Sequence, residues 1–315
     1  MNDHLGHDHL DGGVLDPERF EIDATTVRGF HQEYVREGSG GVPLVCVHGW
    51  PETKRIWWRV IEPLADAGFE VLVPDLRGFG DSELGPDGFH DVPAHAADLY
   101  ALVHDHLGHE RVVLAGGDLG GPVIQELSLR HPEWVDRMVL FNSPLPHLKG
   151  AMDDLETRPP DEVLDYFVRQ GTDPDGLAAE LDSAAARRAY IAEFYGRRLW
   201  AHPGAFTPEE VAFMVERFTS AIHLRASFGA YEATFSETAR SGPSMFRGRV
   251  NPTRTLILFG TSDHVIHPDF DRMAERVLPD HVGPVRLDDC GHFVPWEAPE
   301  VLVRETVAFC ADLLG

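Results

Sequence analysis

The sequence is poor in lysine and in positive charge overall. Its only two lysines are Lys54 and Lys149, and 27 basic residues stand against 52 acidic ones, which gives the 315-residue chain a formal charge of −25. So negative a protein is unsuited to nucleic acid or anionic membranes, and neither is expected as a partner. Adaptation to salt and a GC-rich genome both produce such a composition, and the sequence does not separate them.

Long apolar runs and a secretory leader are also missing. No run of about 18 apolar residues occurs, so we predict no membrane span. The N-terminus has neither a basic region nor an apolar core, which argues against secretion. The three cysteines, Cys46, Cys290 and Cys310, are far apart in apolar segments, as is typical of buried thiols in a reducing compartment. We therefore expect a cytoplasmic protein, and no cysteine–histidine spacing predicts a metal site.

The pattern of the chain predicts an α/β fold with an insertion. Residues 1–18 are acidic and rich in histidine (His4, His7 and His9) and are expected to form a flexible tail. An antiparallel hairpin is expected over 20–37, and short apolar strands alternate with helical segments from residue 43 onwards. This alternation predicts a mostly parallel sheet with helices on both faces.

The rhythm changes between residues 146 and 248, where helical segments follow one another without strands. We interpret this stretch as a helical cap, inserted after the sixth strand over the carboxyl edge of the sheet, where α/β proteins bind ligands. The predicted core therefore consists of residues 19–145 and 249–315, and no internal repeat is present.

The run GDLGG at residues 117–121 joins a predicted buried strand to a predicted helix. Glycines at such a turn allow the chain to reverse sharply and expose the residue at its apex, the arrangement called a nucleophile elbow. The apex residue is Asp118, where serine usually stands. A carboxylate attacks carbon electrophiles and leaves an ester on the enzyme, which suits epoxides or alkyl halides. The alternative is that Asp118 merely caps the helix.

Two further strand ends supply the partners that a nucleophile needs. Asp263 follows the predicted strand 253–259, and His292 lies in the loop after the last strand. The order Asp118, Asp263, His292 is the nucleophile, acid and histidine order of α/β-hydrolases. Asp263 can then fix the tautomer of His292 and stabilise its cation.

These residues resemble the epoxide hydrolase branch of the α/β-hydrolase superfamily over almost the whole chain after residue 20. The motifs that carry the resemblance are HGWP at 48–51, DLRGFGDS at 75–82, GDLGG at 117–121, GTSD at 260–263 and GHFV at 291–294. The resemblance implies an oxyanion hole made by the backbone N–H groups of Trp50 and Leu119. It also implies no cofactor, a small apolar epoxide and water as reactants, and it leaves a homodimer open.

The same resemblance implies two cap tyrosines that act as the acid over the epoxide oxygen. Tyr166, in the run DYFV, and Tyr231, in the run FGAYE, stand at the matching places. Tyr190 and Tyr195 compete for this role, and a packing role is open for all four. Arg77 and Glu297 are expected to brace loops near the site.

The chain departs from its relatives at three positions. Gly117 replaces the histidine that commonly precedes the nucleophile, and Leu119 replaces the tryptophan or arginine with which dehalogenases hold a halide. Asn142 stands where some relatives carry the triad acid, which leaves that role to Asp263. The predicted activity is therefore epoxide hydrolysis. The alternatives are a haloalkane or haloacid dehalogenase with the same triad, and a non-catalytic protein that binds an apolar ligand under its cap.

Overall fold

The computed structural model of the chain describes residues 13–315. The predicted tail lies mostly outside this range, and so do His4, His7 and His9. Eight strands form one sheet in the order β1-β2-β4-β3-β5-β6-β7-β8. The strands are β1 (Ile22–Val27), β2 (Phe30–Glu37), β3 (Val42–Val47), β4 (Phe69–Pro74), β5 (Val112–Gly116), β6 (Val135–Phe141), β7 (Thr255–Gly260) and β8 (His281–Leu287).

The sheet is parallel except at one edge. The strand β2 runs antiparallel to both β1 and β4, and every pair from β4 to β8 is parallel. The strands β4, β5 and β7 are buried along their whole length, as apolar strands covered on both faces should be. The predicted mostly parallel sheet is confirmed.

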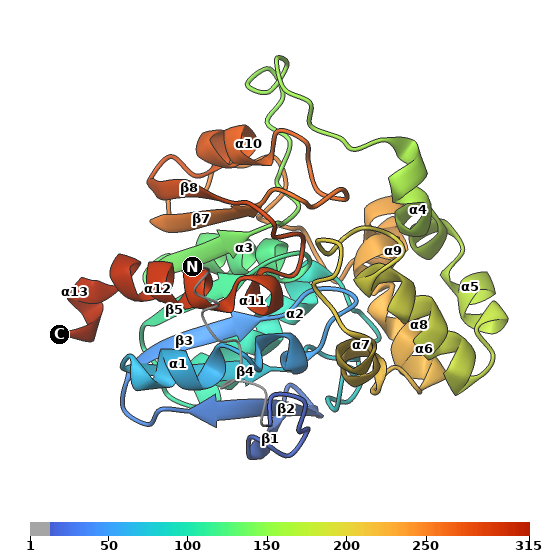
Figure 1. Ribbon diagram of the computed structural model, residues 1–315, viewed down its shortest axis with the longest axis horizontal. Helices are drawn as coiled ribbons and strands as arrows, with labels where there is room; N and C mark the ends of the chain where they lie inside the picture. The colour runs from blue at the N-terminus through green and yellow to red at the C-terminus, as the bar shows by residue number, and fades with distance from the viewer. Residues whose placement is uncertain (1–12) are drawn as a thin grey trace, which may run out of the picture.

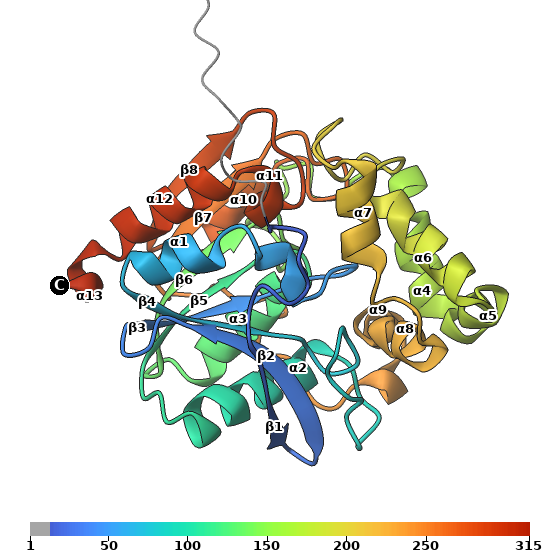
Figure 2. The same ribbon diagram turned by 60° about the horizontal axis from the view of Figure 1, so that its bottom comes forward.

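Helices cover both faces of this sheet (Figures 1 and 2). The helices α1 and α12 lie on one face, and α2 and α3 lie on the other. The core helices are η1 (Lys54–Trp57), α1 (Ile61–Asp66), α2 (Val92–Tyr100), η2 (Ala101–His106), α3 (Gly120–Arg130), α10 (Phe270–Val277), α11 (Val294–Glu297), α12 (Pro299–Phe309) and α13 (Ala311–Leu314). Within residues 13–315, none of the helices combines the length and apolarity that crossing a bilayer requires.

The sheet has a topological switch point at its centre. The chain passes from β3 to β4 on one side and then returns to place β5 on the other side of β3. Loops that leave the carboxyl ends of two such strands diverge and open a crevice between them. The loop after β3 carries Trp50 and the loop after β5 carries Asp118, so the candidate site lies at this point.

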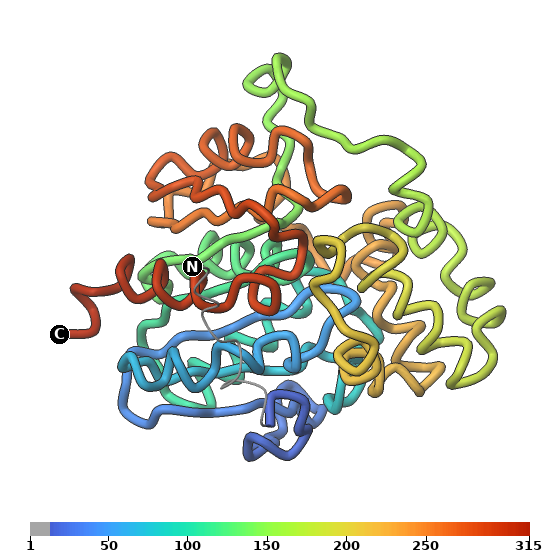
Figure 3. The backbone as a smooth tube through the Cα atoms, in the orientation of Figure 1, coloured from blue at the N-terminus to red at the C-terminus, as the bar shows by residue number. Residues whose placement is uncertain are grey.

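Helices between β6 and β7 form the cap, which gathers at one end of the sheet (Figure 1). Its elements are η3 (Asp161–Leu164), α4 (Asp165–Thr172), α5 (Pro174–Glu180), α6 (Ala184–Ala192), η4 (Glu193–Tyr195), α7 (Pro208–Val215), α8 (Ala221–Ser227), α9 (Gly229–Phe235) and η5 (Glu237–Ala239). A long connection leaves β6 and loops outward before it reaches α4 (Figure 3). The domain limits at 146 and 248 stay predictions.

Ion pairs fix the loop after β3 and tie the cap to it. Lys54, one of the two lysines, places its Nζ 2.5 Å from Asp75 and 2.6 Å from Asp81. Asp81 also pairs with Arg217 of the cap at 2.7 Å. Lys54 and Asp75 are almost fully buried, so each needs the other, since an unpaired buried charge is strongly destabilising. These ion pairs thus fix the segment that directly follows the HGWP motif.

Candidate active site

Asp118 occupies the apex of the turn between β5 and α3. Its backbone has φ +42°, in the left-handed region that asparagine and aspartate tolerate better than other non-glycine residues. The main-chain N–H of Asp118 donates to the carbonyl of Asn142 at 3.0 Å, which anchors the turn to the end of β6. The side chain is buried, with 10% of its surface exposed. This is the geometry expected of a nucleophile elbow.

Phe141 explains the unusual glycine that precedes Asp118. A Cβ atom placed on Gly117 would lie 2.3 Å from Cε2 of the Phe141 ring, closer than any real contact. Phe141 in turn packs edge-on against Trp57 at 5.7 Å. Phe141, from the neighbouring strand, therefore fills the space that a side chain at position 117 would need. This packing explains why the chain has glycine and not histidine there.

One candidate oxyanion donor already contacts the carboxylate. The N–H of Trp50 donates to Oδ1 of Asp118 at 2.7 Å. The N–H of Leu119, at the start of α3, has no hydrogen-bond partner among the described residues. Because it lies at the N-terminus of a helix, this free donor suits an oxygen that gains negative charge.

His292 lies between the other two predicted members of the triad. Its Nε2 is 3.2 Å from Oδ2 of Asp118, and its Nδ1 is 2.7 Å from Oδ2 of Asp263. Asn142 donates its amide to the same Asp263 oxygen at 2.9 Å, and the N–H groups of Val265 and Ile266 donate to Oδ1. The residues at the two alternative positions for the triad acid are therefore in direct contact, and the Asn142 amide supports the carboxylate of Asp263.

The charges of this group shift its titration. Burial alone would lower the pKa of His292, but the carboxylates of Asp263 and Asp118 outweigh burial and raise that pKa well above its ordinary value. Burial raises the pKa of Asp263, while the charge and hydrogen bond of His292 more than compensate and lower it. The free site therefore favours an imidazolium between two carboxylates.

The cap tyrosines fall into two pairs. Tyr190 accepts a hydrogen bond from the Gln170 amide at 3.0 Å, and Tyr195 donates to the carbonyl of Pro51 at 2.6 Å. The hydroxyls of Tyr166 and Tyr231 form no hydrogen bond within residues 13–315, although both rings are more than nine-tenths buried. Both hydroxyl oxygens keep some accessible surface, so they remain free to donate to a ligand. This contrast, which the sequence could not provide, favours Tyr166 and Tyr231 as the acids.

Both of these tyrosines face the loop that carries Trp50. The Tyr166 ring stacks on the Trp50 ring with centroids 5.8 Å apart, and Tyr231 meets Trp50 edge-on at 5.6 Å. Burial, followed by the negative charge of Asp118, raises the pKa of each hydroxyl well above 10. Both therefore stay protonated and able to donate at neutral pH.

Aromatic side chains enclose the rest of the site. Trp200 packs against the His292 ring at 4.8 Å and against Tyr166 at 5.0 Å, and Phe228 approaches Trp50 at 6.4 Å. Phe213, by contrast, packs on Trp58 and under the Arg55 guanidinium. In the described part of the chain, no cluster of three His, Cys, Asp or Glu side chains could hold a metal ion.

Glu52 is a buried acid near the site that sequence reasoning missed. Its carboxylate accepts the N–H of Gly49 at 2.5 Å, and only 6% of the residue is exposed. Burial, followed by repulsion from Asp118, raises the pKa of Glu52 to about 8. The only signal in the sequence is an acidic residue three positions after Gly49, the spacing at which a side chain can reach back to a backbone N–H.

This raised pKa predicts a pH-dependent stability. Folded Glu52 binds a proton up to about pH 8, whereas the unfolded residue loses it near 4.5. The carboxyl should therefore lower the free energy of unfolding progressively as pH rises from 4.5 to 8, by up to a few kcal/mol. Glu52→Gln keeps an acceptor for Gly49 and should remove this component. Urea unfolding of both proteins at pH 5 and pH 8 measures it, and an equal pH effect in both would contradict the assignment.

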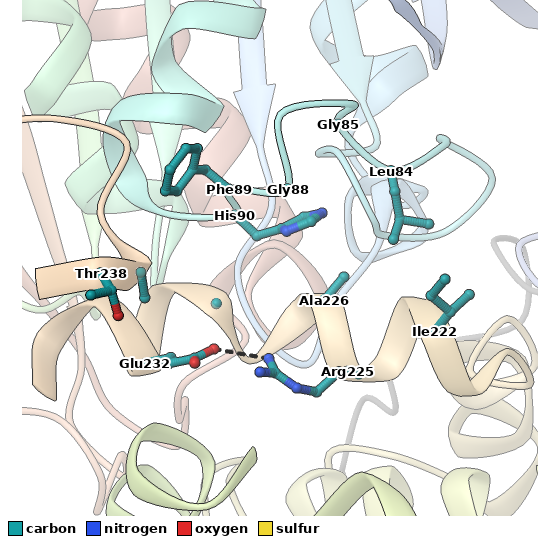
Figure 4. A pocket seen from close by; sticks show the side chains of 12 residues that line it. Leu84, Gly85, Gly88, Phe89, His90, Ile222, Arg225, Ala226, Glu232 and Thr238 are labelled. Atoms are coloured by element: carbon teal, nitrogen blue, oxygen red, sulfur yellow. Dashed lines mark hydrogen bonds and ion pairs between the residues drawn. The ribbon is translucent and has the colours of Figure 1, made fainter. Parts of the chain in front are cut away.

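A separate cavity of about 430 Å³ lies at the junction of core and cap (Figure 4). Its lining comes from residues 84–90 of the core and from α8, α9 and η5, and includes His90, Ile222 and the ion-paired Arg225 and Glu232. None of the catalytic candidates lines it. The helix α9 begins in close contact with His90, because a Cβ on Gly229 would lie 2.6 Å from the Cβ of His90.

Comparisons with known proteins match the sequence and the fold of the chain. A model of the alpha/beta hydrolase fold family matches residues 42–299. A soluble epoxide hydrolase from Corynebacterium sp. (strain C12) is 30% identical over 290 residues, which cover 91% of this chain and 96% of that protein.

Solved structures show the same architecture. An epoxide hydrolase without ligand, CorEH, superposes with a TM-score of 0.78 at 24% identity and covers 93% of this chain and 99% of its own. A haloalkane dehalogenase from Bradyrhizobium elkani reaches a TM-score of 0.72 at 20% identity, over 93% of this chain and 98% of its own. At such identities the likeness concerns the fold alone, so the choice between the two chemistries depends on the residues at the site.

Proposed function

The chain belongs to the alpha/beta hydrolase fold family, and we propose that it is an epoxide hydrolase that works through an ester on Asp118. One observation carries the proposal. A carboxylate at the elbow has one oxygen on the Trp50 N–H and the other beside His292, and two unpaired tyrosine hydroxyls lie in the cap above it. That arrangement offers a nucleophile on one side of a ring carbon and proton donors for the ring oxygen on the other.

In the first step, Oδ2 of Asp118 attacks an epoxide carbon. The carbon–oxygen bond of the strained ring breaks, its electron pair passes to the ring oxygen, and that oxygen takes a proton from Tyr166 or Tyr231. The product is a hydroxyalkyl ester and a tyrosinate held by the second tyrosine. This step needs no base, because Asp118 is already a carboxylate.

In the second step, water attacks the carbonyl carbon of the ester and gives a proton to Nε2 of His292. Negative charge develops on Oδ1, where the N–H groups of Trp50 and Leu119 stabilise it, an effect worth roughly 3 kcal/mol per donor. The tetrahedral intermediate collapses, the diol oxygen leaves with the proton from His292, and the acid proton of Asp118 returns to the tyrosinate. Formation of the ester prepares this step, since it removes the Asp118 charge that helps to raise the pKa of His292, so that the imidazolium releases its proton to solvent before water attacks; the histidine takes a proton up again once the Asp118 carboxylate has re-formed.

The tyrosine assignment gives a direct prediction. Tyr166→Phe and Tyr231→Phe should each lower kcat/KM for an epoxide by roughly 10²-fold or more, because the negative charge that forms on the ring oxygen as the ring opens would have one proton donor fewer. Tyr190→Phe is the matched control, since its hydroxyl is held by Gln170. Steady-state assays with styrene oxide compare the three. An effect of Tyr190→Phe as large as that of Tyr231→Phe would refute the assignment.

A dehalogenase with the same triad is the second candidate, and two observations count against it. Leu119 offers no side-chain N–H for a halide, and the indole of Trp50 donates to the Ser227 hydroxyl at 3.1 Å. A non-catalytic binding protein would be expected to lack one triad partner, whereas all three contact here.

The aromatic walls favour a small apolar epoxide as substrate, with water as the other reactant. A cytoplasmic location and a homodimer stay predictions. Release of free halide from a panel of haloalkanes, without diol from any epoxide, would transfer the assignment to a dehalogenase.

A further inference from the structure

A short segment of the cap contacts the backbone of the loop that carries His292. The carbonyl of Trp200 accepts the main-chain N–H of His292 at 2.8 Å. A Cβ on Gly291 would lie 2.4 Å from that carbonyl oxygen and 2.6 Å from the backbone nitrogen of His202, so only glycine permits this approach. The cap therefore contacts the His292 loop directly through main-chain atoms.

Glu297 joins the two segments. Its Oε2 accepts the N–H of Gly291 and the N–H of His202, both at 2.8 Å, and its Oε1 accepts the N–H of Phe293 at 2.8 Å. Two of these donors flank His292 in the core, and the third belongs to the cap. Hydrogen bonds from backbone N–H groups to a carboxylate are stronger than neutral ones, so one side chain fixes three points of two domains.

A second contact holds the same cap segment beside the triad acid. Nδ1 of His202 lies 2.9 Å from the Ser262 hydroxyl, next to Asp263 in the chain, and the N–H of Ser262 donates to the carbonyl of Cys290 at 2.9 Å. Residues 200–202 are thus fixed to the loops of both Asp263 and His292. Their connection to Glu297 is the one that reaches both sides of the histidine.

We propose that Glu297 is a positioning residue through which the cap holds His292 at the ester, so that it acts on hydrolysis of the ester and not on its formation. The inference rests on the proposed function, since it assumes the two steps described above. Asp118 and the cap tyrosines carry out the first step, and none of them contacts Glu297 through a hydrogen bond. His292 is needed as a base only in the second step, where a small misplacement of Nε2 costs rate.

The test separates the two steps in a single turnover. Wild type, Glu297→Gln and Glu297→Ala are mixed with styrene oxide, cyclohexene oxide or epichlorohydrin, quenched at intervals and weighed as intact proteins. In Glu297→Gln, ester formation should keep its wild-type rate while hydrolysis slows by roughly tenfold or more, so that ester accumulates. Glu297→Ala should accumulate at least as much ester as Glu297→Gln, because glutamine can still accept hydrogen bonds from some of the three N–H groups and alanine from none. If the alanine variant does not fold, the glutamine variant decides.

Glu216→Gln is the control, because it removes a cap-to-core ion pair with Arg55 at an exposed glutamate and leaves the three hydrogen bonds of Glu297 in place. Both of its rates should equal those of wild type. Equal slowing of both steps in Glu297→Gln, or hydrolysis at the wild-type rate, would overturn the proposal. A wild type that turns over none of the epoxides and forms no ester would instead refute the proposed function.

Discussion

Replacement of Asp118 by alanine is expected to lower epoxide turnover by roughly 10⁴-fold or more, the scale seen when a triad enzyme loses its nucleophile. The proposed reaction has no other group that could form the covalent bond, since His292 and both tyrosines serve only in proton transfer. The expectation is checked by measuring diol formation at an enzyme concentration high enough to detect the residual turnover. Substantial residual turnover would mean that water attacks the epoxide directly.

The elbow geometry dictates the control for this variant. Asp118 has φ +42°, where alanine carries a strain of about 1 kcal/mol that asparagine largely avoids. Asp118→Asn should therefore match the wild type in thermal unfolding, while Asp118→Ala should unfold somewhat earlier. If both variants are folded and inactive, the loss belongs to the carboxylate and not to the turn. An active and folded alanine variant would contradict the mechanism.

The second large effect is expected for His292→Gln. Its steady-state turnover should fall by roughly 10³-fold or more, yet a first equivalent of epoxide should still react. The reason is that the first step uses a ready carboxylate, whereas water needs the imidazole as base. Intact-protein mass spectrometry should then show an adduct equal to the full mass of the epoxide, and the adduct should be absent when Asp118 is also replaced by asparagine.

The pH dependence of the wild type should agree with this result. The base must be neutral in the ester form, so protonation of His292 at low pH should block hydrolysis and let the ester accumulate. In the free enzyme the neighbouring carboxylates already favour the imidazolium, which does not hinder the first step. A His292→Gln protein that forms no adduct, or one that turns over at the wild-type rate, would contradict the role of the histidine.

The parts of the site that the sequence predicted are those determined by local structure. A glycine-rich strand–helix turn places its apex residue at the carboxyl edge of the sheet, so residues 116–121 made Asp118 a candidate, while the choice between nucleophile and helix cap depended on Asp263 and His292. The ends of parallel strands meet at one edge of a sheet, so Asp263 and His292 could be assigned by their order. The hairpin over 20–37 and the insertion after the sixth strand followed from strand periodicity and from its interruption.

The parts that it did not predict depend on contacts between distant segments. Which tyrosines have free hydroxyls depends on Gln170 and Pro51, and no periodicity reveals those partners. The link from Glu297 to the cap joins residues 95 positions apart, and the loss of a side chain at Gly117 depends on Phe141 from the next strand. Such contacts are decided by how the elements pack in three dimensions. They leave no pattern among neighbouring residues of the sequence.

The central claim, that Asp118 carries the substrate as an ester, is tested most directly by one turnover of wild-type enzyme in water labelled with heavy oxygen. Enzyme in excess over epoxide limits each site to at most one turnover, and the peptide that contains Asp118 and the diol are both weighed. The mechanism predicts that the diol oxygens both carry ordinary oxygen, because one comes from the epoxide and one from the carboxylate, while Asp118 gains the label. Heavy oxygen in the diol and none in Asp118 would show direct attack by water and contradict the account.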